Sequence, residues 1–188
     1  MAYFPLYIDM KNLKVLLVGG STIACEKLEK LLLFTKEITV ISSNIKKETQ
    51  LLITEHNLTF YQRAYQVGDI DGFDIVVVAT NTLDLHQSIY EESRGSRILI
   101  NSVDNTKYCD FIFPSFIQKG DLTVAISTNG ASPAFAKKMR QYFEENIPNS
   151  VEMFLKNMKN LRKTMPKGKA RMKHFDYLVK GYFAKHFK

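Results

Sequence analysis

The stretch KVLLVGGSTIACEK, residues 14–27, decides the fold class of this chain. Residues 14–18 are a short apolar run, which predicts a buried strand. Gly19 and Gly20 follow directly and predict a tight turn. Residues 22–34 then place apolar side chains at helical spacing, so the chain passes from a strand through a turn into an amphipathic helix.

The predicted helix at residues 22–34 has an apolar stripe that can pack on a sheet. The stripe consists of Ala24, Leu28, Leu31 and Leu32, and the other sides carry Ile23, Lys27, Lys30 and Phe34. A strand predicted at residues 38–42 completes a strand–helix–strand unit of about 30 residues, in which the strands are parallel.

The alternation of strands and helices continues to about Asp104. The run at residues 75–79 (IVVVA) is apolar throughout, which is typical of a central parallel strand covered on both faces. The other expected elements are strands at residues 58–62 and 98–103 and helices at residues 46–56 and 82–94. This pattern predicts an α/β fold with a Rossmann-type parallel sheet.

After Pro114 the pattern changes, and we expect an attached, mainly helical portion that starts near Phe116. Asn129 and Gly130 predict a turn. Ser132 and Pro133 signal the start of a helix, with Ser as the cap and Pro at the first helical position. The elements expected here are a strand at residues 122–127 and helices at residues 134–146, 150–164 and 171–187.

Composition is that of a globular protein, with 45% apolar and 24% charged residues in a chain of 188. The first 14 residues lack the basic flank and apolar core of a signal peptide. No apolar run approaches the roughly 20 residues that span a bilayer. We therefore expect a cytoplasmic protein without a membrane segment.

Neither the cysteines nor the histidines have the spacing of a metal site. Cys25 and Cys109 lie far apart and form no CxxC pair, so we expect two reduced, mostly buried thiols. The four histidines show no paired ligand spacing and are expected to be surface or helix residues; they are His56, His86, His174 and His186. The sequence therefore predicts no metal centre.

Positive charge is concentrated in the last part of the chain. From Ser150 onward there are eleven Lys or Arg residues against Glu152 and Asp176, within a total formal charge of +7. Such a surface can be a solvated helix face, or it can bind nucleic acid, an acidic membrane or a polyanionic small molecule. Charge alone does not choose among these.

The glycine turn has the context of a dinucleotide site, because it joins a strand to a helix whose N-terminus can hold a pyrophosphate. Against the usual G-x-G-x-x-G pattern, Gly19, Ser21 and Ala24 occupy the three positions. Ser21 replaces the middle glycine, whereas alanine is an accepted replacement for the last. Small residues here would let phosphate approach the backbone.

Polar residues follow three further strands, where ligands of a doubly wound sheet collect. Ser42, Ser43 and Asn44 follow the second strand in place of the acidic residue that usually contacts the ribose. No arginine lies beside them, although Lys46 and Lys47 follow closely, so we favour NAD over NADP. The other strand ends carry Thr80 and Asn81, and Asp104.

Six motifs in order resemble the precorrin-2 dehydrogenase / sirohydrochlorin ferrochelatase family. They are FPLY at residues 4–7, VGGSTIACEK, VVVATNT, INSVD, CDFIFPS and AISTNGASPAFAKKMRQ. The resemblance covers the whole chain. It implies an NAD-dependent oxidation of precorrin-2 to sirohydrochlorin in sirohaem synthesis, and in some members iron insertion as well.

The resemblance also implies a domain organisation and a homodimer. Residues 1–115 would be the NAD-binding domain, residues 116–147 a dimerisation segment and residues 148–188 a helical region lining a tetrapyrrole cleft. The basic helices make physical sense against the acetate and propionate groups of precorrin-2.

Site residues follow from the matching motifs. Asp104 would be a general base or an electrostatic partner of the developing cation, with a turn or cap aspartate as the alternative. The cofactor set is Gly19, Gly20, Ser21, Thr22, Ile23, Ser42, Ser43, Asn44, Thr80 and Asn81. Ser127, Thr128, Ser132 and Pro133 would face the substrate, or would merely cap a helix.

Three positions depart from the family pattern. Ser21 stands where a glycine is common, Glu26 where a basic residue is common, and Thr82 where an acidic residue is common. Glu26 would repel a pyrophosphate if it faced one.

Two rival functions use the same features. A non-catalytic NAD-binding regulatory module shares the fold, and Asp104 with a tetrapyrrole-sized cleft distinguishes the enzyme from it. Nucleic-acid binding through the basic tail is disfavoured, because the tail shows no recognised binding module and its aromatic spacing suits helix packing.

Overall fold

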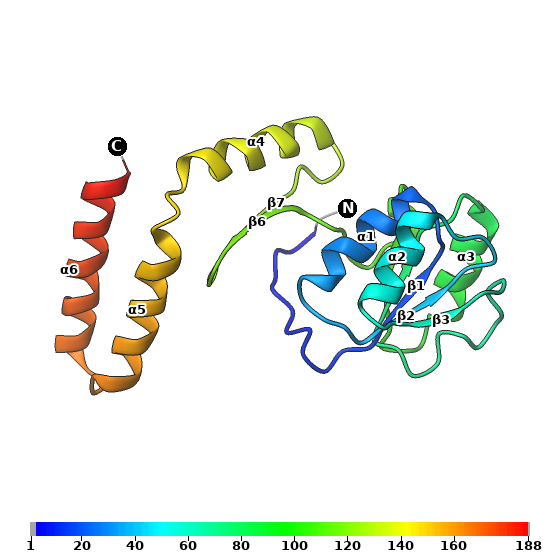
Figure 1. The fold of residues 1–188 in the computed structure, drawn as a ribbon, viewed down its shortest axis with the longest axis horizontal. Coiled ribbons are helices and arrows are strands. Elements are labelled where there is room, and N and C mark those ends of the chain that lie inside the picture. Colours follow the sequence, from blue (N-terminus) through cyan, green and yellow to red (C-terminus); the bar gives the residue numbers. More distant parts are fainter. Residues whose placement is uncertain (1–2, 188) are drawn as a thin grey trace. The chain divides into compact units, whose positions relative to one another are not determined.

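The computed structural model describes residues 3–187 of the chain, and they form two compact units. The first unit comprises residues 3–113 and the second residues 114–187. Both are drawn as ribbons in Figure 1.

Residues 3–113 contain a five-stranded sheet in the order β3-β2-β1-β4-β5, with every neighbouring pair parallel. The strands are β1 (Val15–Val18), β2 (Ile38–Ile41), β3 (Thr59–Tyr61), β4 (Ile75–Val78) and β5 (Leu99–Ser102). Because all strands run the same way, their carboxyl ends share one edge. The strand order reverses between β1 and β4, and ligands of such sheets bind at that reversal.

Helices cover both faces of this sheet (Figure 1). On one face, Val15 and Leu17 of β1 pack with α1 (Thr22–Leu32) and α2 (Lys47–Glu55). On the other, Leu16 and Val18 pack with Ile89 of α3 (Leu83–Glu92). Successive strand residues point to opposite faces. The continuous apolar runs of the central strands therefore follow from having a core on each side.

The second unit begins with an antiparallel hairpin of β6 (Ser115–Lys119) and β7 (Leu122–Ile126). Three helices follow: α4 (Pro133–Asn146), α5 (Val151–Thr164) and α6 (Lys169–His186). The Lys119 ammonium donates to the carbonyls of Glu144 and Ile147, at 2.9 and 2.5 Å, and to Asn149 Oδ1 at 3.1 Å. This contact joins β6 to the C-terminal end of α4.

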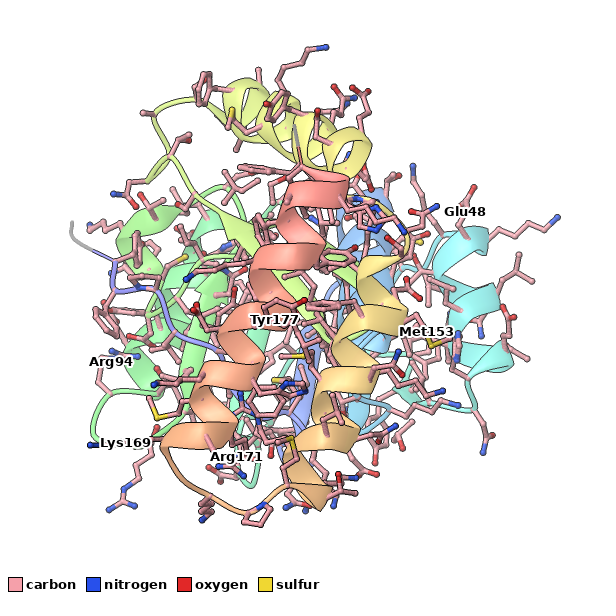
Figure 2. All side chains as sticks on the ribbon, turned by 90° about the vertical axis from the view of Figure 1, so that its left-hand side faces the viewer. Glu48, Arg94, Met153, Lys169, Arg171 and Tyr177 are labelled. Atoms are coloured by element: carbon pink, nitrogen blue, oxygen red, sulfur yellow. The ribbon has the colours of Figure 1, made fainter. Side chains whose placement is uncertain are left out.

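Helices α5 and α6 lie side by side (Figures 1 and 2). The rings of Phe154 and Tyr182 stack with their centroids 4.1 Å apart, and the Tyr182 hydroxyl lies 2.8 Å from Ser150 Oγ. Arg171, labelled at the lower end of α6 in Figure 2, donates to the carbonyls of Arg162 and Met165, each at 3.2 Å. Aromatic packing and these carbonyl contacts hold the pair.

The predicted parallel α/β sheet, followed by helices, is confirmed. The expected elements are present, with ends that differ by one or two residues. The expectation of a single strand after Pro114 is wrong, because β6 pairs with β7. Gln118 and Lys119 interrupt the apolar pattern of β6, so its sequence does not read as a strand. No helix among residues 3–187 is long and apolar enough to cross a membrane.

Candidate nucleotide and active site

The turn after β1 needs its glycines to fit the rest of the first unit. Gly19 has φ +132°, and a Cβ there would lie 2.3 Å from the Ala79 carbonyl oxygen. A Cβ on Gly20 would lie 2.5 Å from the carbonyl oxygen of Asn44 and 2.9 Å from Cα of Ile45. The glycines therefore serve the packing of the turn against two neighbouring loops, in addition to any room they leave for a phosphate.

The N-terminus of α1 offers free amide groups beside a positive charge. The Ser21 hydroxyl accepts from the Ala24 amide at 3.4 Å, whereas the amides of Thr22 and Ile23 have no partner among residues 3–187. Lys46 Nζ donates to Thr22 Oγ1 at 3.0 Å. A helix N-terminus with such donors suits a pyrophosphate.

Glu26 does not disturb this arrangement. It is exposed and lies beyond the first turn of α1, which the structure describes in full and which carries no acidic residue. The repulsion considered from the sequence is therefore removed, because the effect of the helix dipole is confined to the terminal turn.

The loop after β2 packs on the glycine turn. The Lys46 amide donates to the Gly20 carbonyl at 2.9 Å, and the Ser42 hydroxyl donates to the Asn44 carbonyl at 2.7 Å. Ser43 and Asn44 are exposed. The side chains of these two residues are thus available for an adenosine ribose, while the Ser42 proton is used within the turn.

The loops after β4 and β5 lie next to each other because the strands are paired. The Val103 amide donates to the Val78 carbonyl at 2.9 Å, which extends the ladder one residue beyond β5. Thr80 is half-buried, whereas Asn81 and Asp104 are exposed. The fold thus brings the ten predicted cofactor residues and Asp104 to one edge of the sheet.

Asp104 occupies an unusual backbone conformation with a free carboxylate. Its φ is +61°, in the left-handed region that residues other than glycine seldom adopt. Among residues 3–187 its carboxylate has no hydrogen-bond or ion-pair partner, and the cap of the following turn Thr106–Tyr108 is Asn105. Asp104 is therefore not the cap of that turn, but the bond from the Asn105 amide to the Ser102 carbonyl places it in a turn of its own, as the turn alternative expects, and its catalytic role stays a prediction.

Cys109 closes the turn that carries Asp104. Its sulfur accepts from the Ser102 amide at 3.1 Å and lies 3.1 Å from the Ser102 carbonyl oxygen and 3.3 Å from that of Asn105. Burial raises the pKa of the Cys109 thiol, so the thiol is protonated and can donate. Cys25 is buried as expected, whereas Cys109 is only half-buried.

Lys27 is a half-buried cation that the helical pattern did not indicate. The helical pattern placed it away from the apolar stripe, yet it is half-buried, and its ammonium lies 4.8 Å from the centre of the Phe113 ring. Burial lowers the pKa of Lys27, Lys30 acts in the same direction, and the charge of Asp104 opposes both. A cation therefore lies within electrostatic reach of the carboxylate.

The four residues expected to face the substrate belong to the second unit, whereas Asp104 belongs to the first. Ser127 Oγ accepts from the Asn129 amide at 3.0 Å, and Thr128 Oγ1 from the Ser132 amide at 3.1 Å. Ser132 caps α4, where Pro133 is the first residue. These contacts fit the capping alternative, and the substrate role stays a prediction.

Among residues 3–187, no group of three or more His, Cys, Asp or Glu side chains is arranged to hold a metal ion. His86 lies in helix α3, which is one of the two alternatives expected for the histidines, and it is buried with only 3% of its surface exposed. A polar side chain on the inner face of a helix leaves little trace in the hydrophobic pattern.

Comparison with known proteins supports a nucleotide site at this edge of the sheet. A family model described as "Putative NAD(P)-binding" matches residues 6–115, which include β1 to β5 and all the predicted cofactor residues. The chain belongs to this NAD(P)-binding family. A second family model, described as "Sirohaem biosynthesis protein central", matches residues 119–146 of the same chain.

Siroheme synthases are among the proteins to which this chain is similar. The chain is 33% identical to the siroheme synthase of Pseudoalteromonas atlantica over 88% of this chain and 36% of the relative. It is 30% identical to that of Zymomonas mobilis over 98% of this chain and 40% of the relative. This NAD(P)-binding chain thus spans between a third and two fifths of the length of these relatives.

A solved structure has the same fold. The structure of "SirC, precorrin-2 dehydrogenase" is similar with a TM-score of 0.77 and 24% identity, over 90% of this chain and 85% of that one. The Rossmann-type fold expected from the sequence is thereby confirmed, and the NAD(P)-binding family is shown by the model over residues 6–115.

Proposed function

We propose that this chain is an NAD-dependent dehydrogenase that oxidises precorrin-2 to sirohydrochlorin. The observation that carries the proposal is the unpartnered carboxylate of Asp104 at the nucleotide edge of an NAD(P)-binding domain. The sirohaem family segment at residues 119–146, together with siroheme synthases and a precorrin-2 dehydrogenase among the similar proteins, supports the substrate.

The free amides of Thr22 and Ile23 would hold the pyrophosphate of the cofactor, with Lys46 beside them. Ser43 and Asn44 would contact the adenosine ribose, and Thr80 and Asn81 would lie on the nicotinamide side. When bound, NAD supplies the acceptor for a hydride from the macrocycle.

Asp104 would accept the proton that leaves the macrocycle as the hydride departs. Its freedom from other partners keeps an oxygen available for that proton. Before the transfer, the carboxylate is negative and would stabilise positive charge that develops on the pyrroles.

The same proposal includes how the substrate is attracted, the oligomeric state and the choice of cofactor. The basic residues that follow Ser150 would attract the carboxylates of the tetrapyrrole, the chain would act as a homodimer, and NAD would be preferred to NADP. We also propose that the enzyme works in the cytoplasm.

The deciding experiment incubates the purified protein with precorrin-2 generated in situ and NAD, without metal, and follows the visible spectrum. Conversion to sirohydrochlorin is expected, and Fe²⁺ added afterwards tests iron insertion separately. NAD binding without any conversion would replace this proposal with the non-catalytic NAD-binding module.

A further inference from the structure

His86 of α3 connects two loops of the candidate site. Its Nε2 lies 2.9 Å from the carbonyl oxygen of Thr80, and its Nδ1 contacts the hydroxyl of Ser102. The ring is almost fully buried. The proposed dehydrogenase reaction assigns no role to this side chain.

The tautomer of the neutral ring follows from its partners. A carbonyl oxygen can only accept, so Nε2 must carry the hydrogen that it donates to Thr80. In the neutral ring, Nδ1 then accepts from the Ser102 hydroxyl. Both ring nitrogens are therefore satisfied by groups from two different strand ends.

These contacts extend into the turn that carries Asp104. Ser102 is the last residue of β5, and its amide and carbonyl both contact the sulfur of Cys109. Asp104 lies two residues beyond Ser102. Buried hydrogen-bond networks of this kind make their members rigid.

The network acts where the sheet itself ends. Val78 and Ser102 are paired in the ladder, and the last bond between the two strand ends joins Val103 to Val78. Thr80 lies beyond that bond, so the β ladder does not hold its carbonyl. The imidazole supplies that link.

We propose that His86 is a positioning residue that fixes Thr80 and Asn81 relative to the turn of Asp104. The inference rests on the proposed function for the identity of the reactants. His86 makes no contact with substrate in this proposal. It acts by fixing the position of Thr80 and Asn81, on the nicotinamide side of the candidate site, relative to the carboxylate of Asp104.

Two conservative variants separate the contacts. His86→Gln can place an amide NH₂ near the position of Nε2, whereas His86→Asn can place one near Nδ1. We expect H86Q to lose part of kcat, because the link to Thr80 survives but the contact with Ser102, which ties Thr80 to the turn of Asp104, is broken. We expect H86N to lose about 10- to 100-fold in kcat with a nearly unchanged KM for precorrin-2, because small displacements in a reacting pair have effects of this size.

A purely structural role would give a different pattern. It would lower the Tm of both variants and leave kcat per folded molecule unchanged in H86N, and that result would overturn the inference.

A binding measurement separates this inference from the proposed function. NADH and ADP-ribose are titrated into wild type and H86N. ADP-ribose lacks the nicotinamide, so H86N should weaken NADH several-fold and leave ADP-ribose unchanged. Equal weakening of both ligands refutes a role on the nicotinamide side. This comparison holds whether or not the wild-type protein oxidises precorrin-2.

Discussion

At the scale of single residues, the backbone of Asp104 complicates the simplest test of its carboxylate. A left-handed conformation costs about 1–2 kcal/mol for most residues, whereas asparagine, like aspartate, adopts it more readily. With φ +61°, Asp104→Ala would remove the carboxylate and strain the turn at once. Asp104→Asn keeps the shape and removes only the charge.

Asp104→Asn should lower kcat at least about 100-fold, because the proton acceptor is lost, while Tm stays within a few degrees. Steady-state kinetics with precorrin-2 and a thermal melt check this. Asp84→Asn, an exposed acid on α3 of the same unit, is the matched control and should keep its activity. Normal turnover by D104N would remove Asp104 from the mechanism.

Gly20→Ala should destabilise the first unit by about 1–3 kcal/mol, as overpacking does, since its Cβ would meet the backbone of Asn44 and Ile45. It should also weaken NAD by displacing the turn. Gly181→Ala in α6 has open space around it and should stabilise the protein by up to about 1 kcal/mol. Urea unfolding and an NAD titration measure both variants, and an unchanged G20A protein would contradict the packing argument.

At the scale of elements, a side chain from β6 satisfies the C-terminal end of α4. The last carbonyls of a helix have no partner within it and carry partial negative charge. Lys119 donates to two of the carbonyls there and to Asn149, which binds the hairpin to the helix.

Lys119→Met keeps the apolar stem and removes the ammonium, so we expect a loss of about 1–3 kcal/mol in the free energy of unfolding. Amide exchange at the end of α4 should rise as well. Lys159→Met is the control, because its ion pair with Asp121 is exposed and should contribute less than about 1 kcal/mol. Equal losses in both variants would show that Lys119 does not cap α4.

The loop between β3 and β4 contains a carboxylate that links stability to pH. The hydrogen bonds from Arg63, partly opposed by burial, hold the pKa of Asp69 below its usual value. A carboxyl group with a lowered folded pKa stabilises the protein above its unfolded pKa of about 3.9. That stabilisation is lost as the pH falls through the folded pKa.

Arg63→Gln should therefore flatten the decline of stability below about pH 4. Unfolding by urea at a series of pH values measures it, with the wild-type chain as the reference. Parallel curves for the two proteins would show that this ion pair contributes nothing to the acid response.

At the scale of the whole molecule, positive charge is concentrated in the C-terminal helices. This distribution suits the polyanionic substrate proposed above. The residues from Ser150 onward carry eleven basic side chains and two acidic ones. Lys169, labelled in Figure 2, lies at the N-terminal end of α6. Attraction between exposed charges is screened by salt.

The KM for precorrin-2 should rise about threefold or more between low and moderate ionic strength. Replacing Lys169 and Lys173 by glutamine should reduce that dependence. Replacing Lys11 and Lys36, exposed lysines of the first unit, makes the same change in charge and should leave the dependence intact. Equal effects of the two pairs would mean that net charge alone governs substrate attraction.

The sequence by itself determined the features that depend on neighbours along the chain. Strand β1, the glycine turn, α1 and the Ser132 cap of α4 follow from local periodicity and capping chemistry, and the parallel sheet follows from their alternation. Placing the predicted cofactor residues at one edge needed only the rule that parallel strands share a carboxyl edge.

Only the tertiary structure decided which distant groups meet. Gly20 faces the backbone of Asn44, His86 joins Thr80 to Ser102, and β6 finds its partner in β7. Lys27 lies half-buried near Phe113 although its helical position predicts exposure. The physical reason is that burial and hydrogen bonding of a polar side chain depend on what packs against it, and one-dimensional periodicity does not carry that information.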